Sequence, residues 1–174
     1  MKALAALVAY GVLLSTVVSA QSTATEDVEA AYLYQFGRYV EWPADLLGNS
    51  DTFKICVLGT DPLGAILGET VAGKVLTGRP VAAIQILALD ESRDCHILFI
   101  GPSENDRLPE LLKALAGVRI LTVGRGADFT RRGGMIGFTS EERRVRFVIN
   151  VAAADAAKLM LSSRLLRIAL RVER

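Results

Sequence analysis

Histidine and cysteine, the residues most often used as metal ligands, are scarce in this chain. Its 174 residues include one histidine, His96, and two cysteines, Cys56 and Cys95. Zinc sites use three or four protein ligands. Because the two cysteines are expected to pair with each other, the histidine and cysteine residues of this chain cannot supply that number. His96 lies within the apolar run "CHILFI", so we predict a buried histidine rather than a metal ligand or catalytic base. We expect no metal, no cofactor and no catalytic residue, and predict that the protein is not an enzyme.

An excess of charge of either sign is also missing. The chain has 20 lysine and arginine residues against 19 aspartate and glutamate residues. A protein that binds nucleic acid through its phosphates usually carries a clear positive excess. The balance here argues against nucleic acid as a partner.

Long apolar runs are absent except at the start, "MKALAALVAYGVLLSTVVSAQ". Lys2 precedes an apolar run that is shorter than the ~20 residues needed to cross a bilayer. Small side chains at Val18, Ser19 and Ala20 then suit a signal peptidase. We predict a cleaved signal peptide over residues 1–20 and a single exported domain over residues 21–174. The alternative is an uncleaved membrane anchor.

The two cysteines are best interpreted together with this export signal. Thiols tend to pair in oxidising compartments outside the cytoplasm. We therefore predict a disulfide between Cys56 and Cys95, whose Cα atoms must then lie within about 7 Å. Two buried free thiols are the alternative.

Apolar runs and cap residues predict alternating strands and helices. We expect strands at 53–59, 79–89, 95–101 and 118–124, and two strands within 133–150 joined by a turn near Glu141 and Glu142. We expect helices from Thr25 to Trp42, after Asp61, after Ser103, and from Asn150 almost to the C-terminus. The run 95–101 is apolar on both faces, which is typical of a central parallel strand. The pattern predicts a single-domain α/β layered fold with a mostly parallel, mixed sheet flanked by helices.

The first predicted helix contains the stretch "AAYLYQFGRYVEWP", which holds five of the chain's aromatic residues. At 100° per residue, one arc collects the apolar side chains Val28, Tyr32, Leu33, Phe36, Tyr39, Val40 and Trp42. This arc is predicted to face the core. The opposite arc carries Ala30, Tyr34, Arg38 and Glu41. We interpret Tyr34, Arg38 and Glu41, with Trp42 at the edge, as a partner-binding surface, although a singly exposed tyrosine is common.

With these segments placed, the chain resembles the YfiR family of periplasmic proteins. The matching pieces run in order: "EAAYLYQFGRYVEWP", "FKICVLGTDPLG", "CHILFIGPSE", "ILTVG", "FTRRGGMIGF" and "VRFVINVAAADAAKLMLSSRLLRIA". The resemblance implies a periplasmic regulator that represses a membrane diguanylate cyclase by binding its periplasmic sensor part. It also implies an α/β fold and frequent homodimers. The partner expected from it is the periplasmic domain of an inner-membrane signalling protein.

Three further patterns have mainly structural interpretations. "GTDPLG" joins a strand to a helix but lacks the lysine of a phosphate-binding loop, so Asp61 is predicted to cap the helix. Arg131 and Arg132 precede two glycines, and we interpret this stretch as a structural turn. The alternative is that the two arginines bind an anionic ligand or an acidic partner. Arg164, Arg167, Arg171 and Arg174 are predicted to form one stripe on the last helix, which suits solvent or, alternatively, docking to an acidic protein surface or lipid head groups.

The leading hypothesis is therefore a non-enzymatic periplasmic regulator. The alternative is a periplasmic carrier or sensor of a small ligand, with a pocket at the strand ends near Arg131 and Arg132. A hydrolase is the third hypothesis.

Overall fold

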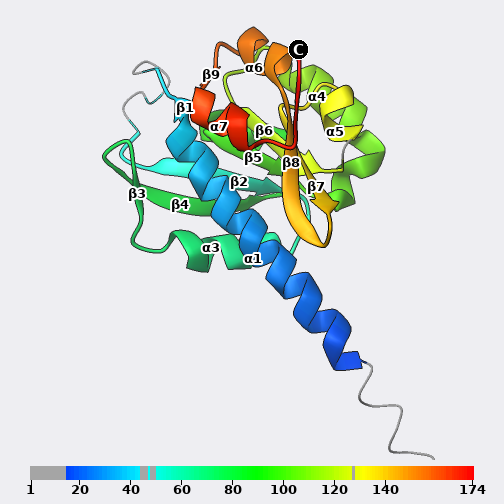
Figure 1. The fold of residues 1–174 in the computed structure, drawn as a ribbon. Coiled ribbons are helices and arrows are strands. Elements are labelled where there is room, and N and C mark those ends of the chain that lie inside the picture. Colours follow the sequence, from blue (N-terminus) through cyan, green and yellow to red (C-terminus); the bar gives the residue numbers. More distant parts are fainter. Residues whose placement is uncertain (1–14, 44–46, 48–49, 127) are drawn as a thin grey trace, which may run out of the picture.

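The computed structural model describes residues 15–43, 47, 50–126 and 128–174, with side chains described from Ala24 onward. The first fourteen residues of the predicted signal peptide lie outside this range. Figure 1 shows a twisted sheet with helices packed against it and the first helix running past one side.

The sheet has eight strands in the order β10-β8-β7-β6-β5-β2-β4-β3. Their bounds are β2 Phe53–Leu58, β3 Val75–Leu76, β4 Arg79–Ile86, β5 Ile97–Ile100, β6 Leu121–Arg125, β7 Ile136–Glu141, β8 Arg144–Asn150 and β10 Arg171–Glu173. The pairs from β4 to β7 are parallel, as is β10 with β8, whereas β7–β8 and β3–β4 are antiparallel. The predicted fold class, a single α/β domain with a mostly parallel mixed sheet, is confirmed.

The central strands bury both faces because helices cover both sides of the sheet. Alternate residues of a strand point to opposite faces, so Ile55 and Val57 join one core while Cys56 and Leu58 join the other. The first core is covered by α1 (Ser15–Tyr39) and α3 (Leu63–Val71). The second is covered by α4 (Leu108–Leu115) and α5 (Asp128–Arg131). As predicted, β5 is central and parallel to both neighbours.

Helix α1 spans Ser15–Tyr39 within the described residues, so it is already formed before Thr25, where we predicted its start. The segment between Ser15 and Thr25 has no glycine or proline, so a helix formed over the sheet can propagate backward without a break. Its buried arc is rotated from the predicted one. Val28 is 42% exposed, while Ala30 is fully buried. Helix α3 packs beside α1, and Ala30 belongs to the core that the two helices cover.

The C-terminal segment is not the single helix that we predicted. It folds as α6 (Val151–Ala156), β9 (Met160–Leu161), α7 (Ser163–Ile168) and β10. Lys158, at φ +57°, follows α6 with a backbone that a helix cannot use, and the Ser162 hydroxyl caps α7 by accepting a hydrogen bond from the Leu165 N–H. Strand pairing replaces helical hydrogen bonds in this segment: β9 pairs with β1 (Val40–Glu41), and β10 pairs with β8.

The arginine stripe predicted for this segment is therefore wrong as a helical feature. Arg164 and Arg167 lie on α7, Arg171 lies on β10, and Arg174 follows that strand.

Two of the three predicted helix caps form. The Asn150 side chain accepts a hydrogen bond from the Ala153 N–H at 3.0 Å, and the Asp61 carboxylate accepts one from the Leu63 N–H at 2.8 Å. Ser103 does not cap a helix. It lies in the 3₁₀ helix η2 (Pro102–Arg107), which precedes α4. The predicted hairpin is present, with left-handed backbone at Glu142 and Arg143 in its turn. A further 3₁₀ helix, η1 (Leu89–Asp94), follows β4.

Candidate functional site

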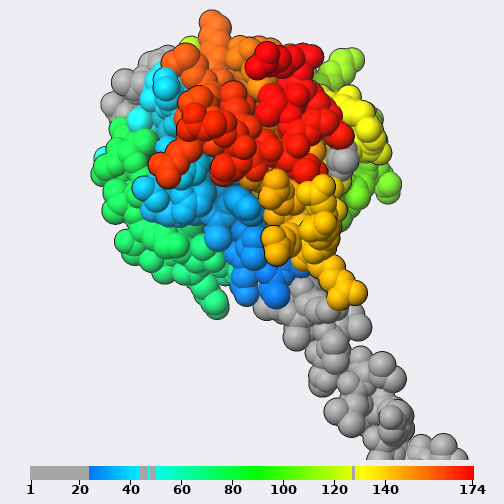
Figure 2. Space-filling view, viewed as in Figure 1, coloured from blue at the N-terminus to red at the C-terminus, as the bar shows by residue number. Residues whose placement is uncertain are grey.

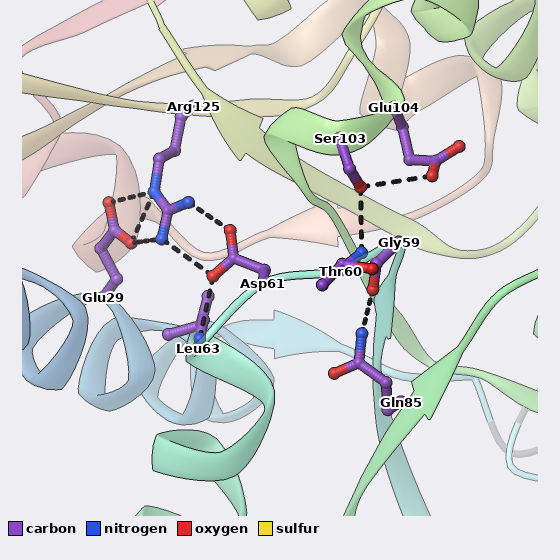
Figure 3. Close-up of polar contacts among 9 residues, drawn as sticks. All are labelled: Glu29, Gly59, Thr60, Asp61, Leu63, Gln85, Ser103, Glu104 and Arg125. Atoms are coloured by element: carbon purple, nitrogen blue, oxygen red, sulfur yellow. Dashed lines mark hydrogen bonds and ion pairs between the residues drawn. The ribbon is translucent and has the colours of Figure 1, made fainter.

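The carboxyl ends of the central parallel strands meet at one edge of the sheet, where α/β proteins commonly place a site. Strand β2 runs into Gly59, Thr60 and Asp61, and Arg125 ends β6. Figure 3 shows these residues together with Glu29 of α1, which reaches over the edge. The edge is occupied by the protein's own side chains.

Arg125 lies between two carboxylates and binds both. Its Nε and Nη2 donate to Glu29 Oε2 at 2.9 and 2.7 Å, and its Nη1 donates to Asp61 Oδ2 at 2.5 Å. Both carboxylates are nearly inaccessible, and the Arg125 side chain is 28% exposed. Asp61 also accepts the Leu63 N–H, as described above. The cluster therefore ties α1, the β2–α3 turn and β6 into one unit.

Burial and pairing act in opposite directions on the charges of this cluster. Burial raises the pKa of the Glu29 carboxyl above its ordinary value, and the hydrogen bonds of Arg125 offset only part of that rise. Burial by itself would lower the pKa of Arg125, but the hydrogen bonds to Glu29 and Asp61 reverse the effect and raise it. The guanidinium therefore stays charged, and both of its carboxylate partners are held in place by it.

The neighbouring turn is closed by a second group of hydrogen bonds. Gly59 has φ +87°, a conformation that favours glycine, and its carbonyl accepts a hydrogen bond from Gln85 Nε2. The Ser103 hydroxyl accepts the Thr60 N–H at 2.9 Å and donates to Glu104 (Figure 3). The Thr60 N–H, the kind of donor that a phosphate would need, is already used by Ser103. The arrangement holds the sheet edge together.

Sequence reasoning did not identify the Glu29–Arg125–Asp61 cluster. Asp61 was assigned only as a cap, and Glu29 and Arg125 stand 96 positions apart. The one signal in the sequence was that Arg125 and Asp61 both follow predicted parallel strands and therefore lie at the same edge of the sheet. This signal does not identify Glu29 of α1 as their partner.

His96 is buried, as predicted. Its Nδ1 accepts the Lys54 N–H at 3.1 Å, and its ring stacks on Phe53 with centroids 4.4 Å apart. Burial, together with the charges of Arg79 and Lys54, lowers the pKa of His96, while a hydrogen bond to Lys54 and the charge of Asp94 act in the other direction. The histidine is therefore neutral at neutral pH and contributes to packing.

The cysteines form the predicted disulfide. Cys56 of β2 and Cys95, just before β5, are bonded with Cα atoms 5.9 Å apart. Both are buried in the second core. Among the described residues, no three His, Cys, Asp or Glu side chains gather closely enough to hold a metal ion.

The predicted partner-binding residues lie at the C-terminal half of α1 and just beyond it. Arg38 and Glu41 are exposed. Tyr34 is half-buried, because its hydroxyl donates to the Val75 carbonyl at 3.3 Å and its ring lies 4.7 Å from Lys74 Nζ. Glu41 and Trp42 follow the helix, so helical periodicity does not place them. Trp42 packs edge-on against Phe53 and donates to the Gly37 carbonyl, so much of its ring serves the core.

Backbone pairing brings the C-terminal segment to the same surface. Glu41 in β1 pairs with Met160 in β9, and the Arg164 guanidinium lies 5.7 Å from the centre of the Tyr39 ring. Figure 2 shows residues of α7 beside the end of α1. We call this the α1-end surface and define it by Tyr34, Arg38, Glu41, Val75, Met160, Arg164, Arg167 and Ile168. Three of its apolar side chains are strongly exposed: Met160 at 62%, Val75 at 54% and Ile168 at 48%.

The other predicted arginines lie elsewhere. Arg131 ends α5 and pairs with Asp128, and Arg132 is exposed in the turn that follows. The hollow of about 270 Å³ next to Gly133 and Met135 does not include either arginine in its lining. Arg171 pairs with Glu173 of its own strand.

Fold and surface together define a class: an α/β domain whose sheet edge is closed by an internal ion cluster and whose exposed apolar side chains flank its first helix. The chain belongs to the YfiR/HmsC-like family, whose model matches residues 26–170. This membership supports a regulatory rather than a catalytic role in general. Over the part of the chain that the structure describes, no helix has the length and apolarity needed to cross a bilayer.

Comparison with solved structures supports the fold alone, and only the first of the two structures described below is similar enough to do so. A conserved domain protein from Vibrio cholerae O1 biovar El Tor is 12% identical, with a TM-score of 0.53 over 74% of this chain. This chain spans 56% of that structure. An ABC domain in complex with L-Trp from Streptococcus pneumoniae is 10% identical, with a TM-score of 0.49 over 69% of this chain and 55% of that one. No curated protein matches the chain.

Proposed function

We propose that this protein is a non-enzymatic periplasmic regulator that binds and represses the periplasmic sensor part of a membrane signalling protein of the diguanylate cyclase type. Family membership supports the regulatory role. The apolar start of the sequence supports export with cleavage after Ala20, and the buried Cys56–Cys95 disulfide is consistent with an oxidising compartment. Homodimerisation is part of the same proposal.

The observation that carries this proposal is the α1-end surface. Large apolar side chains that stay strongly exposed in one region of a soluble protein favour contact with a partner. Here Met160, Val75 and Ile168 are exposed on three segments that contact α1 or β1, which carry Tyr34, Arg38 and Glu41. Apolar area with a surround of both charges is the composition of a docking surface.

Two features make this surface ready to bind without rearrangement. The ring of Tyr34 is held by Lys74 and the Val75 carbonyl, and the β1–β9 pairing fixes Met160 beside Glu41. Side chains that are already ordered lose less entropy on binding. The surface therefore offers a rigid aromatic contact and a fixed apolar contact to a partner.

The test begins with a pull-down by mature protein, residues 21–174, from solubilised inner membranes, with mass spectrometry of the captured proteins. The proposal requires that a membrane signalling protein with a cyclase domain is among them. Affinity is then measured with its purified periplasmic part. Capture of proteins without a membrane signalling architecture would overturn the proposal.

We predict that Tyr34→Ala together with Arg38→Ala weakens this binding by about 1 kcal/mol or more, because contact area and a charge are lost together. The melting temperature must be measured alongside, since Tyr34 also packs against Lys74.

Two control variants separate binding from folding. Tyr34→Phe keeps the ring and should retain most of the affinity. Phe36→Ala removes a fully buried ring and should destabilise the domain by about 3–5 kcal/mol, with any loss of binding secondary. Unchanged affinity in a well-folded Tyr34→Ala, Arg38→Ala variant would exclude this part of the surface.

A further inference from the structure

A second surface carries positive charge that the fold does not use. A groove of about 850 Å³ lies between the Ala24–Tyr32 part of α1 and the β7–β8 hairpin. Helix α1 contributes Ala24, Thr25, Val28 and Tyr32 to its lining, and the hairpin contributes Ser140, Arg143, Arg144, Val145 and Arg146. Figure 2 shows the hairpin projecting beside this part of α1. We call it the hairpin groove.

The residues that line the groove carry charge of one sign, although Glu141 lies opposite Arg144 in the strand pairing of the hairpin. Three arginines line the groove and no carboxylate is among the lining residues. Arg143 and Arg144 are exposed, and within the described part of the chain neither they nor Arg146 takes part in an ion pair. The Nε of Arg146 is buried and has no hydrogen-bond partner there. A buried donor without an acceptor costs free energy.

The floor is apolar, which favours a polypeptide over other anions. Val28 is 42% exposed, and Tyr32 and Val145, which also line the groove, are half-buried. A phosphate ion is far smaller than the hollow and leaves this apolar area uncovered. Lipid headgroups on a flat bilayer present no chain that fills a groove with two walls. A protein segment with alternating acidic and apolar side chains fits both the arginines and the floor.

Strand β8 also offers free backbone groups to such a segment. Strand β10 pairs with β8 only at Val148–Asn150, and the Leu170 N–H bonds to the Phe147 carbonyl at 2.9 Å. Outward-facing backbone groups alternate along a strand with a period of two, so the next outward pair belongs to Val145. No described residue bonds to that pair on the β10 side. An added strand would continue the line of β10 and place its side chains beside Arg144 and Arg146.

We propose that the hairpin groove binds an extended acidic segment of a partner protein, which adds as a strand to β8 and pairs its carboxylates with Arg143, Arg144 and Arg146. This site is separate from the α1-end surface, and it stands whether or not that surface is the regulatory contact.

The test uses mature protein and a fluorescein-labelled peptide of alternating glutamate and leucine, with binding followed by fluorescence anisotropy. The wild type should bind this peptide but not a matched peptide of alternating glutamine and leucine. Arg144→Gln together with Arg146→Gln should weaken binding by at least about tenfold. The matched control, Arg164→Gln with Arg167→Gln on α7, removes the same charge elsewhere and should change affinity by less than about twofold.

Val145→Pro examines the strand pairing, because proline removes the outward N–H while leaving the bonds to β7 untouched. It should also weaken binding by about tenfold, with a melting temperature that shows the hairpin is intact. If Val145→Pro does not fold, a peptide N-methylated at alternate backbone positions makes the same test and should bind correspondingly weakly.

Several outcomes would overturn the proposal. These are failure of the wild type to bind the acidic peptide at low salt, equal losses in the groove and control variants, and full displacement by inorganic phosphate or by phosphatidylglycerol vesicles. If the N-methylated peptide bound with full affinity, the proposed addition of a strand to β8 would be wrong. Retained peptide binding in the Tyr34→Ala, Arg38→Ala variant is expected, and separates this site from the α1-end surface.

Discussion

Arg125 joins three segments that are far apart in the chain. It is the only cation that the structure places against the buried carboxylates of Glu29 and Asp61 within the described residues. A buried charge that loses its partner is costly, whereas a well-paired one is nearly neutral to stability. Removing Arg125 is therefore expected to be destabilising because it leaves two buried carboxylates without a partner.

We predict that Arg125→Met lowers the free energy of unfolding at neutral pH by about 3–5 kcal/mol, because two buried carboxylates are left unpaired. Without Arg125, the folded-state pKa of Glu29 rises further above its unfolded value. The ionised Glu29 carboxylate therefore destabilises the variant above this raised pKa, and the destabilisation disappears as Glu29 becomes protonated at lower pH. The difference from wild type should thus shrink between about pH 7 and about pH 4 in denaturant unfolding.

The control for this variant is Arg107→Met, which breaks an exposed pair with Glu104 and should cost at most about 1 kcal/mol. A loss at Arg125 no larger than that at Arg107 would contradict the assigned role of the cluster.

His96 gives a second pH dependence, with the opposite sign. Its folded-state pKa is lowered, chiefly by burial, so the unfolded chain binds the proton more readily. Stability is therefore complete above the unfolded pKa of about 6.5 and falls as the pH is lowered through it. We predict that the melting temperature decreases from about pH 7.5 to about pH 5.5, and that His96→Gln flattens this dependence. An equal slope in both proteins would assign the effect to other groups.

At the scale of elements, two glycines within helices differ in their surroundings. A Cβ added at Gly68 of α3 would meet nothing within 4 Å, whereas one at Gly37 of α1 would lie 2.5 Å from Leu76 Cδ1 and 3.5 Å from Phe53. Gly37 therefore lets α1 approach the sheet closely, while Gly68 has no such contact to make.

We predict that Gly68→Ala stabilises the protein by about 0.5–1 kcal/mol through helix propensity. The same change at Gly37 should give no gain, because Leu76 must move. Thermal unfolding of both variants tests this, and an equal rise in melting temperature would show that α1 does not need the close approach.

At the scale of the whole molecule, the disulfide restrains the unfolded chain. Cys56 and Cys95 are 39 positions apart, and closing a loop of this length stabilises a domain by about 4 kcal/mol in the chain-entropy model. We predict that Cys56→Ala with Cys95→Ala lowers the melting temperature to that of the reduced wild type. A reducing agent should then have no further effect on the variant, and a remaining effect would point to another reducible group.

The sequence alone determined the features that depend on neighbours along the chain. Apolar runs located strands β2, β4, β5, β6, β7 and β8, because buried strands demand apolar residues, but they did not locate the short strand β3. Cap residues located two helix starts, at Asp61 and Asn150, because their side chains bond to backbone only a few positions away. The cysteine pair followed from composition and the export signal.

Only the tertiary structure decided the features that depend on distant partners. The segment after Lys158 became β9, α7 and β10 because β1 and β8 offered backbone partners that no local pattern reveals. The same pairing separated the arginines and brought Met160 beside Glu41. The cluster of Arg125 and the hairpin groove likewise bring together residues from opposite ends of the chain. Contacts of this kind arise from packing in three dimensions, and local periodicity carries no information about them.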